Sequence, residues 1–219
     1  MAGVGTGRNV TGHRDDRAML LSIRCPVCRR AEGAPCIECR ELFSPVGPVP
    51  PPTGVDALFA ATSYTDAARP LVAALKYRNQ RAVTSWLASA MVAVLPPDEH
   101  PVVVTWAPTS PARRRERGFD QAELLARAVA RRIGVAPRRL LVRRSGGPQT
   151  GRGAAERHAD VTRFLPTRRP APPSVLLVDD VVTTGATMRS AAGALHVGGA
   201  RRVVGLVAAA TPPPGGPSR

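Results

Sequence analysis

Four cysteines are the first residues in this 219-residue sequence whose spacing suggests chemistry. They form two Cys-x-x-Cys pairs seven residues apart, namely Cys25, Cys28, Cys36 and Cys39. Each pair can aim two thiolates at one tetrahedral ion, and four thiolates make a closed structural zinc site. The alternatives are two disulfides or four free thiols, and disulfides are disfavoured in the cytosol. The spacing therefore predicts a structural Zn²⁺ whose binding is coupled to the folding of this short segment.

Two adjacent carboxylates, Asp179 and Asp180, form the second candidate site because they directly follow the apolar run 174–178. That run lacks polar alternation, which predicts a central strand covered on both faces. Ligands of open α/β sheets bind beyond the carboxyl ends of the strands. Successive side chains of a strand point to opposite faces, so the two carboxylates can converge on one ligand only if the chain leaves strand geometry there.

The segment 183–187 continues this second site with the residues Thr183, Thr184, Gly185, Ala186 and Thr187. Glycine permits close backbone approach, hydroxyls donate hydrogen bonds, and a following helix N-terminus favours an anion. Neighbouring carboxylates would suit the vicinal hydroxyls of a sugar, or Mg²⁺ with its waters. The sequence contains no GxxxxGK[ST] motif, so the segment is not a Walker P-loop. We predict a phosphate site at 183–187.

The elements that must position these residues alternate between strand and helix patterns. Strands are expected at 58–64, 101–108, 174–180 and 201–208, and helices at 70–77, 82–95, 121–133 and 187–197. Asp120 is expected to cap the third helix, with Glu123 at the capping-box position and Gly134 at its end. This alternation predicts an α/β fold with a doubly wound, mostly parallel sheet.

Composition divides the chain into five expected parts. Residues 1–20 and 211–219 are expected to be disordered, 21–43 to form the four-cysteine zinc module, 44–54 to be a Pro-rich linker, and 55–210 to form the ligand-binding domain. No run of eighteen apolar residues exists, and the N-terminus has no apolar leader segment. We therefore expect a cytoplasmic protein without a membrane span.

The formal net charge of +15 is carried almost wholly by arginine, since Lys76 is the single lysine. Residues 101–169 hold 16 arginines against 5 acidic residues, a local net charge of +11. Such a block attracts phosphate, whether on a nucleotide or on a polynucleotide. The alternative is a solvated Arg-rich surface. An aromatic content of 4% argues against platforms that stack nucleic-acid bases.

The run VLLVDDVVTTGAT, residues 175–187, resembles the phosphoribosyl-pyrophosphate motif of type I phosphoribosyltransferases. The resemblance implies a phosphoribosyltransferase-like α/β domain that binds 5-phosphoribosyl 1-diphosphate (PRPP) with Mg²⁺. It further implies that Asp179 and Asp180 bind the ribose 2′- and 3′-hydroxyls. The 5′-phosphate would then be held by Thr183, Thr184, Gly185, Ala186 and Thr187.

Further segments are similar to the ComF family, which includes proteins linked to natural competence and DNA utilisation. They are Lys76 in AALKYRNQ, the run 111–130, and Gln149 with Glu156-Arg157, and the resemblance covers roughly residues 22–210. It implies that 105–110 is a pyrophosphate loop and that 145–160 is a lid. Arg157 and Lys76 are the implied catalytic residues, which would neutralise pyrophosphate. The chain departs from the usual family pattern at several positions, among them Asp120 in place of asparagine.

The implied function is transfer of phosphoribose to a nucleobase-type acceptor, in a protein linked to DNA uptake. No residue of the sequence identifies the acceptor. Two alternatives remain on the same fold. One is a non-catalytic competence factor that binds single-stranded DNA and the competence machinery. The other is a regulator that senses PRPP and acts on a partner.

Overall fold

The computed structural model describes residues 24–31, 33–75, 81–144 and 163–212. Its centre is a six-stranded sheet in the order β1-β2-β8-β7-β3-β4. The strands are β1 (Gly47–Val49), β2 (Ala57–Ser63), β3 (Val103–Trp106), β4 (Ala136–Pro137), β7 (Ser174–Val182) and β8 (Arg202–Ala210). All neighbouring pairs are parallel except β1 with β2. The predicted mostly parallel α/β fold is therefore confirmed.

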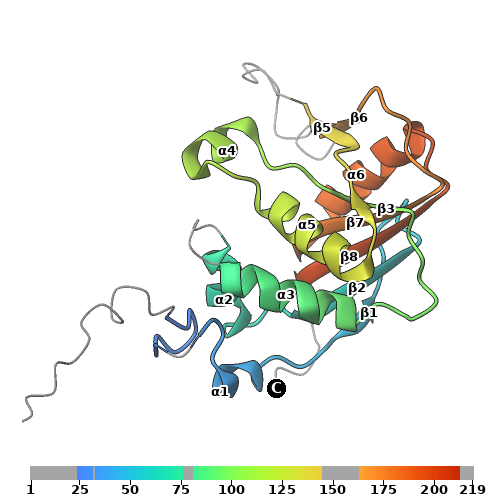
Figure 1. Ribbon diagram of the computed structural model, residues 1–219. Coiled ribbons are helices and arrows are strands. Elements are labelled where there is room, and N and C mark those ends of the chain that lie inside the picture. Colours follow the sequence, from blue (N-terminus) through green and yellow to red (C-terminus); the bar gives the residue numbers. More distant parts are fainter. Residues whose placement is uncertain (1–23, 32, 76–80, 145–162, 213–219) are drawn as a thin grey trace, which may run out of the picture.

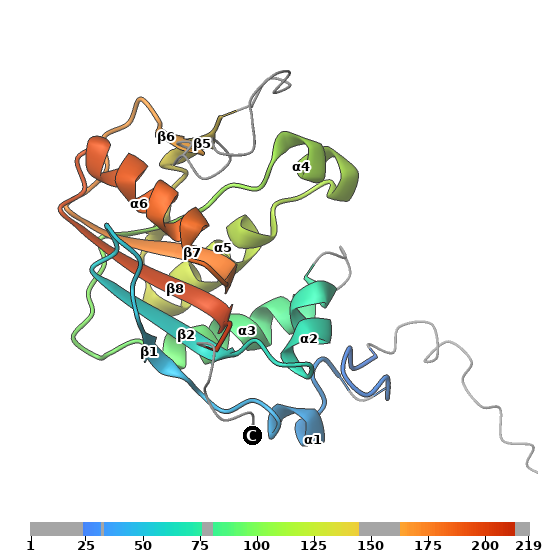
Figure 2. The ribbon, with the colours of Figure 1, turned by 180° about the vertical axis from the view of Figure 1, so that it is seen from behind.

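Helices cover both faces of this sheet (Figures 1 and 2). On one face lie α2 (Ala68–Ala74), α3 (Arg81–Ala93) and α5 (Gln121–Ile133). On the other face lie α6 (Ala186–Val197) and a ribbon of two antiparallel strands, β5 (Leu141–Arg143) and β6 (Phe164–Pro166). Along β7, Leu176 and Val178 pack on the first face while Val175 and Leu177 pack on the second. Burial on both faces explains why this strand reads as an unbroken apolar run.

Helix α5 follows its sequence prediction closely. Asp120 Oδ1 accepts hydrogen bonds from the backbone N–H groups of Ala122, at 3.1 Å, and Glu123, at 3.4 Å. The buried face includes Leu125 and Val129, as the helical period predicts. Gly134 ends the helix with a left-handed φ of 72°. The predicted cap, face and end of this helix are thus confirmed.

Several short elements have no counterpart among the predicted ones. Helix α4 (Pro111–Arg117) begins at Ser110, whose side chain accepts from the Arg113 N–H, and it buries none of its residues. Without an apolar face it has no helical period to detect. The remaining short elements are β4, β5, β6 and α1 (Ile37–Arg40), together with β1, which lies inside the Pro-rich segment 44–54. Each is too short to show a hydrophobic period.

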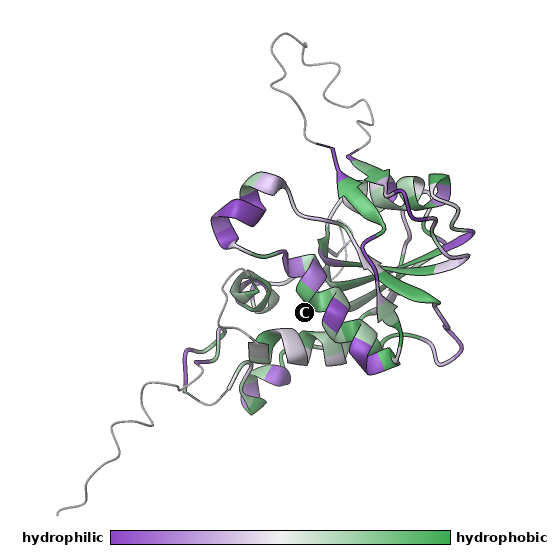
Figure 3. Cartoon of the chain, turned by 45° about the horizontal axis from the view of Figure 1, so that its top comes forward, coloured by the Kyte–Doolittle hydropathy of each residue, from purple (hydrophilic) through white to green (hydrophobic). Residues whose placement is uncertain are grey.

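Hydropathy separates the body of the molecule from α4. Figure 3 shows strongly hydrophilic residues along α4, which stands apart from the sheet, whereas the strands are largely apolar. Among the described residues, none of the helices combines the length and apolar character that a membrane crossing requires.

Candidate functional site

The carboxyl ends of the adjacent strands β7 and β3 lie at the same end of the sheet, and Asp179 and Asp180 lie there. We call this region the carboxylate edge. Strand β7 does not end at the aspartates as predicted but continues to Val182, because β8 runs beside it as far as Ala210 and pairs with it. Asp179 is only 9% exposed, whereas Asp180 is half-buried. Strand pairing thus continues through both carboxylates, so the predicted departure from strand geometry does not occur. The two side chains nevertheless approach one another, since a side-chain interaction with Asp180 is among the causes that raise the pKa of Asp179.

Burial dominates the electrostatics of Asp179. It raises the pKa of this carboxyl well above the usual range, and the negative charge of Asp180 raises it further. The Asp180 N–H opposes these effects by donating to Asp179 Oδ1 at 2.9 Å. The Val181 N–H donates in the same way to Asp180 Oδ1 at 2.8 Å. A ligand that brings a cation or hydroxyl donors would offset the cost of this buried charge.

The loop 183–187 lies directly after these carboxylates. It borders a hollow of about 130 Å³, which is lined by residues 181–188 and by Arg163. Gly185 precedes α6 with a left-handed φ of 71°. A Cβ atom at Gly185 would also lie 2.9 Å from Pro52 Cβ, so this glycine is required by its conformation and by the close approach of Pro52. Helix α6 begins at the hollow, and its N-terminus favours an anion there.

The loop after β3 is fixed by two neighbours. The Ala107 N–H donates to the Val178 carbonyl at 3.2 Å, which ties the loop to β7 beside Asp179. The Thr109 N–H donates to Asp120 Oδ2 at 2.8 Å, which ties the loop to α5. Asp120 is 3% exposed, and burial raises its pKa although the N–H donors of Thr109 and Glu123 oppose this. Asp120 was predicted as a helix cap only, and its second role as a loop anchor depends on the fold.

Arg143, at the end of β5, was not a predicted site residue. Its Nη1 donates to the Pro108 carbonyl at 3.2 Å, and its guanidinium carbon lies 5.4 Å from the ring centroid of Phe164. Burial lowers its pKa, as do the charges of Arg163 and Arg113, while Asp179 and Asp120 act in the opposite direction. Arg143 therefore belongs to the electrostatic environment of the carboxylate edge. The three-residue strand that carries it has no sequence period, so no signal was available.

The four cysteines form a compact cluster. Their sulfur atoms all lie within 4.8 Å of one another, and Cys28 Sγ is 3.5 Å from Cys36 Sγ. All four are free; Cys28 is exposed and the other three are buried. Four sulfurs bound to one Zn²⁺ at about 2.3 Å would be spaced by about 3.8 Å, so the cluster fits a tetrahedral zinc site.

The thiols of this cluster differ in acidity. Burial would raise the pKa of Cys25, but hydrogen bonds from the backbone N–H groups of Cys28, Cys36 and Val27 lower it to about 6. Burial and the neighbouring cysteines raise the pKa of Cys39. Cys25 is thus the thiol best prepared to bind a metal as thiolate.

The cysteine cluster lies on the same side of the molecule as α2 and α3 (Figure 1). Phe43, just after the cluster, contacts Trp86 of α3 edge-to-face with ring centroids 5.2 Å apart. The cluster is thereby attached to the α/β body by side-chain packing as well as by the chain.

Not every predicted site residue can be placed. Lys76 and Arg157, the two predicted catalytic residues, lie outside the described residues, as do Gln149 and Glu156. Asp179 and Asp180 lie in β7, shortly before loop 183–187 in the chain, and neither of them lines the hollow at that loop.

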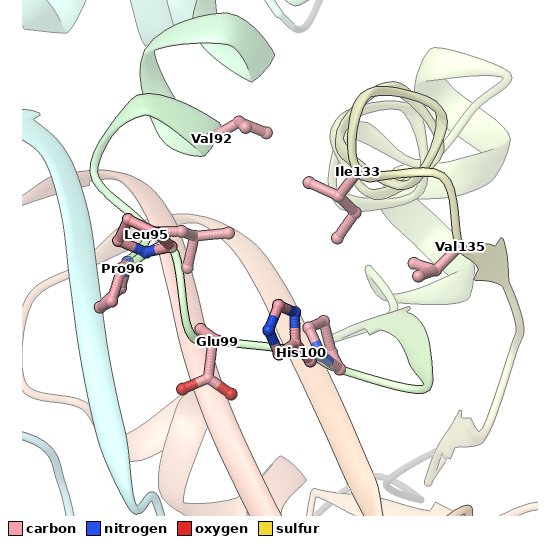
Figure 4. Close-up of a pocket in the computed structure, with 9 residues that line it drawn as sticks. Val92, Leu95, Pro96, Glu99, His100, Ile133 and Val135 are labelled. Atoms are coloured by element: carbon pink, nitrogen blue, oxygen red, sulfur yellow. The ribbon is translucent and has the colours of Figure 1, made fainter.

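A second hollow, of about 390 Å³, lies between the C-terminal ends of α3 and α5 (Figure 4). It is lined mainly by apolar side chains such as Leu95 and Ile133. Its carboxylate, Glu99, is held by Arg202 at 2.7 Å. The hollow precedes β3 and β4 in the chain, so it lies at the amino ends of the strands, opposite to the carboxylate edge.

Comparisons with known proteins do not show which family this chain belongs to. No family model matches the chain, and none of the curated proteins matches it. Among solved structures it is similar to one described as the allosteric regulatory enzyme of purine biosynthesis, with 20% sequence identity and a TM-score of 0.43. The alignment covers 62% of this chain and 30% of that one. The chain thus spans under a third of the length of that structure.

Proposed function

We propose that this chain binds PRPP with Mg²⁺ at the carboxylate edge and transfers the phosphoribosyl group to a nucleobase-type acceptor. One observation carries the proposal. The buried Asp179 and its neighbour Asp180 stand directly before the hollow formed by loop 183–187 and beside the anchored loop 107–110. A sugar with a phosphate at one end and a diphosphate at the other matches this arrangement: the phosphate would bind at loop 183–187, the sugar hydroxyls at the carboxylates and the diphosphate at loop 107–110.

Each part of the ligand has a partner in this proposal. The hydroxyls of Thr183, Thr184 and Thr187, with the backbone of Gly185 and Ala186, hold the 5′-phosphate. Asp179 and Asp180 accept hydrogen bonds from the ribose hydroxyls, which requires them to be ionised. The carboxylate oxygens also fit Mg²⁺, which prefers one or two carboxylates together with substrate phosphates. When bound, Mg²⁺ would neutralise charge on the diphosphate.

The inferred reaction is a displacement at the anomeric carbon. A nitrogen of the acceptor forms a bond to this carbon, and the bond from the carbon to the diphosphate oxygen breaks. Diphosphate leaves with the electron pair, and the acceptor nitrogen loses its proton. The protein contributes mainly by holding both partners in place and by stabilising the leaving anion. We assign the latter role to Arg157 and Lys76, as the family resemblance implies.

Calorimetric titration tests the binding step. The wild type is expected to bind PRPP in the presence of Mg²⁺, and Asp179→Asn/Asp180→Asn to lose at least about 100-fold in affinity, since two charge-assisted interactions are removed. Unchanged binding in the double variant would overturn the assignment of the carboxylates. Diphosphate release with a panel of nucleobases then tests transfer, and binding without release with any of them would favour the PRPP-sensing regulator.

A second candidate function is favoured by α4. This helix carries Arg113, Arg114, Arg115 and Arg117 and buries none of its residues, so it offers exposed positive charge to a polyanion. A competence factor that binds single-stranded DNA would use such a surface. Titration with a fluorescent oligonucleotide should then show that Arg114→Gln/Arg115→Gln weakens DNA binding without changing PRPP affinity. Equal DNA binding by wild type and variant would exclude α4 from that role.

The cysteine cluster and the motifs together support ComF-family membership as part of this proposal. Proteins of the ComF family carry such an N-terminal four-cysteine module together with a phosphoribosyl-binding domain, and this chain has the same order of segments. We infer a role in DNA uptake on that resemblance alone. The test is natural transformation in a strain that lacks the protein, compared with one complemented by the double aspartate variant.

A further inference from the structure

We propose that Arg143 is a specificity-determining residue that binds a second anionic group of the ligand beside loop 107–110. The site would then select a sugar phosphate that carries a diphosphate over one that carries only the 5′-phosphate. This inference rests on the proposed function, because it presumes that the first phosphate binds at loop 183–187.

The guanidinium of Arg143 is fixed in position from two sides. Arg143 stands opposite Phe164 in the β5–β6 ribbon, and the Phe164 ring, which is fully buried, lies beneath the guanidinium. The bond from Nη1 to the Pro108 carbonyl fixes its direction within the plane. A guanidinium has five N–H donors, so one bond to Pro108 leaves donors for a bidentate contact with phosphate oxygens.

The loop that Arg143 contacts is itself held rigidly. Asp120 binds the Thr109 N–H on one side of Pro108, and the Val178 carbonyl binds the Ala107 N–H on the other. Loop 107–110 follows β3, and the carboxylates lie in the adjacent parallel strand β7, just after Val178, which pairs with Trp106 at the end of β3. Adjacent strands lie about 4.8 Å apart, so a ligand on Asp179 also reaches the loop after β3.

The charges around Arg143 favour binding of an anion over binding of a cation. Arg143 is half-buried, and the nearby positive charges of Arg163 and Arg113 disfavour its charged form. Asp120, one of the two opposing carboxylates, already accepts three backbone hydrogen bonds. A diphosphate group beside Arg143 would offset the repulsion that Arg163 and Arg113 exert on it.

Three ligands allow the 5′-phosphate site and the proposed diphosphate site to be tested individually. In the presence of Mg²⁺, wild type and Arg143→Gln would each be titrated with three ligands: PRPP, ribose 5-phosphate and inorganic diphosphate. We expect the variant to lose about tenfold or more in affinity for PRPP and for diphosphate, and to keep its affinity for ribose 5-phosphate within about twofold. Arg143→Lys keeps the charge but not the planar guanidinium, so its affinity for PRPP and diphosphate should lie between those of the wild type and Arg143→Gln.

Arg168→Gln is the matched control, since it removes the same charge from an exposed residue beyond β6. It should leave all three affinities unchanged. Thermal unfolding of each variant checks that the fold is kept. The inference is overturned if Arg143→Gln weakens ribose 5-phosphate as much as PRPP, or if it weakens none of the three. A wild type that binds diphosphate but neither sugar phosphate would instead overturn the proposed function, while the loss of diphosphate binding in Arg143→Gln would still support Arg143 as an anion site.

Discussion

The cysteine cluster and the carboxylate edge both concentrate groups that repel one another when ionised, but they are supported in opposite ways. The cluster spans residues 25–39, and its own core consists of Cys25, Cys36 and Cys39 with Val27 packed against them. The buried Ala34 packs instead into the core of the α/β body, so the cluster has almost no core of its own. The carboxylate edge belongs to a sheet that is packed on both faces. We therefore expect the first region to need a metal ion in order to fold, and the second to fold without its ligand.

Metal removal should give the largest difference between the two regions. We expect one Zn²⁺ per chain by elemental analysis, and chelation or Cys36→Ser should unfold the segment 24–43 while the sheet remains folded. Hydrogen exchange would show fast exchange near the cysteines and unchanged protection in β7 and β8. Ile37→Ala, which changes an exposed side chain and keeps all four thiols, is the control. If zinc-free protein retained slow exchange in the cluster, the contrast between the two regions would be wrong.

At the carboxylate edge, substitution should have the opposite effect on stability. Asp179→Asn removes a buried charge whose ionised form is disfavoured, so the ligand-free protein should gain about 1 kcal/mol in free energy of unfolding at neutral pH, as is common when a functional residue is replaced. Urea denaturation measures this gain. Asp66→Asn, an exposed carboxylate near α2, should change the free energy of unfolding by less than about 0.5 kcal/mol. A clear loss of stability in Asp179→Asn would show that the carboxylate is structural.

The pH dependence follows from the same raised pKa. Since the pKa of Asp179 is higher in the folded protein than in the unfolded chain, the folded state binds more protons between the two values. Stability contributed by this group is therefore full below the unfolded pKa of about 3.9 and is lost as the pH rises toward the folded value. Asp120 contributes with the same sign. Urea titrations at several pH values should show a smaller decline for Asp179→Asn than for the wild type; identical slopes would contradict the assignment.

Substitutions of Asp120 should separate its two roles. Asp120→Asn keeps an oxygen for the cap of α5 but places an NH₂ group opposite the Thr109 N–H, so loop 107–110 loses its anchor. We expect a loss of about 1 kcal/mol in stability and a larger relative loss in diphosphate affinity. Asp120→Ala removes the cap as well and should cost about 1 kcal/mol more. Wild-type stability and wild-type diphosphate affinity in Asp120→Asn would show that the Thr109 contact is dispensable.

The same contrast explains what could be predicted from sequence. The cysteine site is local, since its four ligands lie within residues 25–39 and their spacing alone suggests the cluster. The strand 174–180, the cap at Asp120 and the glycine at 185 are also local signals, and the structure contains all of them. Arg143 could not be predicted, because its relation to Pro108 and Asp179 exists only after β5 has paired with β6 and β3 with β7. The continuation of β7 past the aspartates likewise depends on its partner β8.

We expect Asp179 and Asp180 to lower the stability of the ligand-free protein and a phosphoribosyl ligand to offset this loss. The most direct test of this expectation is the unfolding midpoint of wild type and of Asp179→Asn/Asp180→Asn, each measured with and without Mg²⁺ and PRPP. Without ligand, we predict that the double variant unfolds at a higher temperature than the wild type. Ligand should leave the midpoint of the double variant unchanged and raise that of the wild type. For the wild type this corresponds to a gain of about 2.7 kcal/mol in free energy of unfolding at 100 times the dissociation constant. An equal rise in both proteins, or no rise in the wild type, would contradict the account.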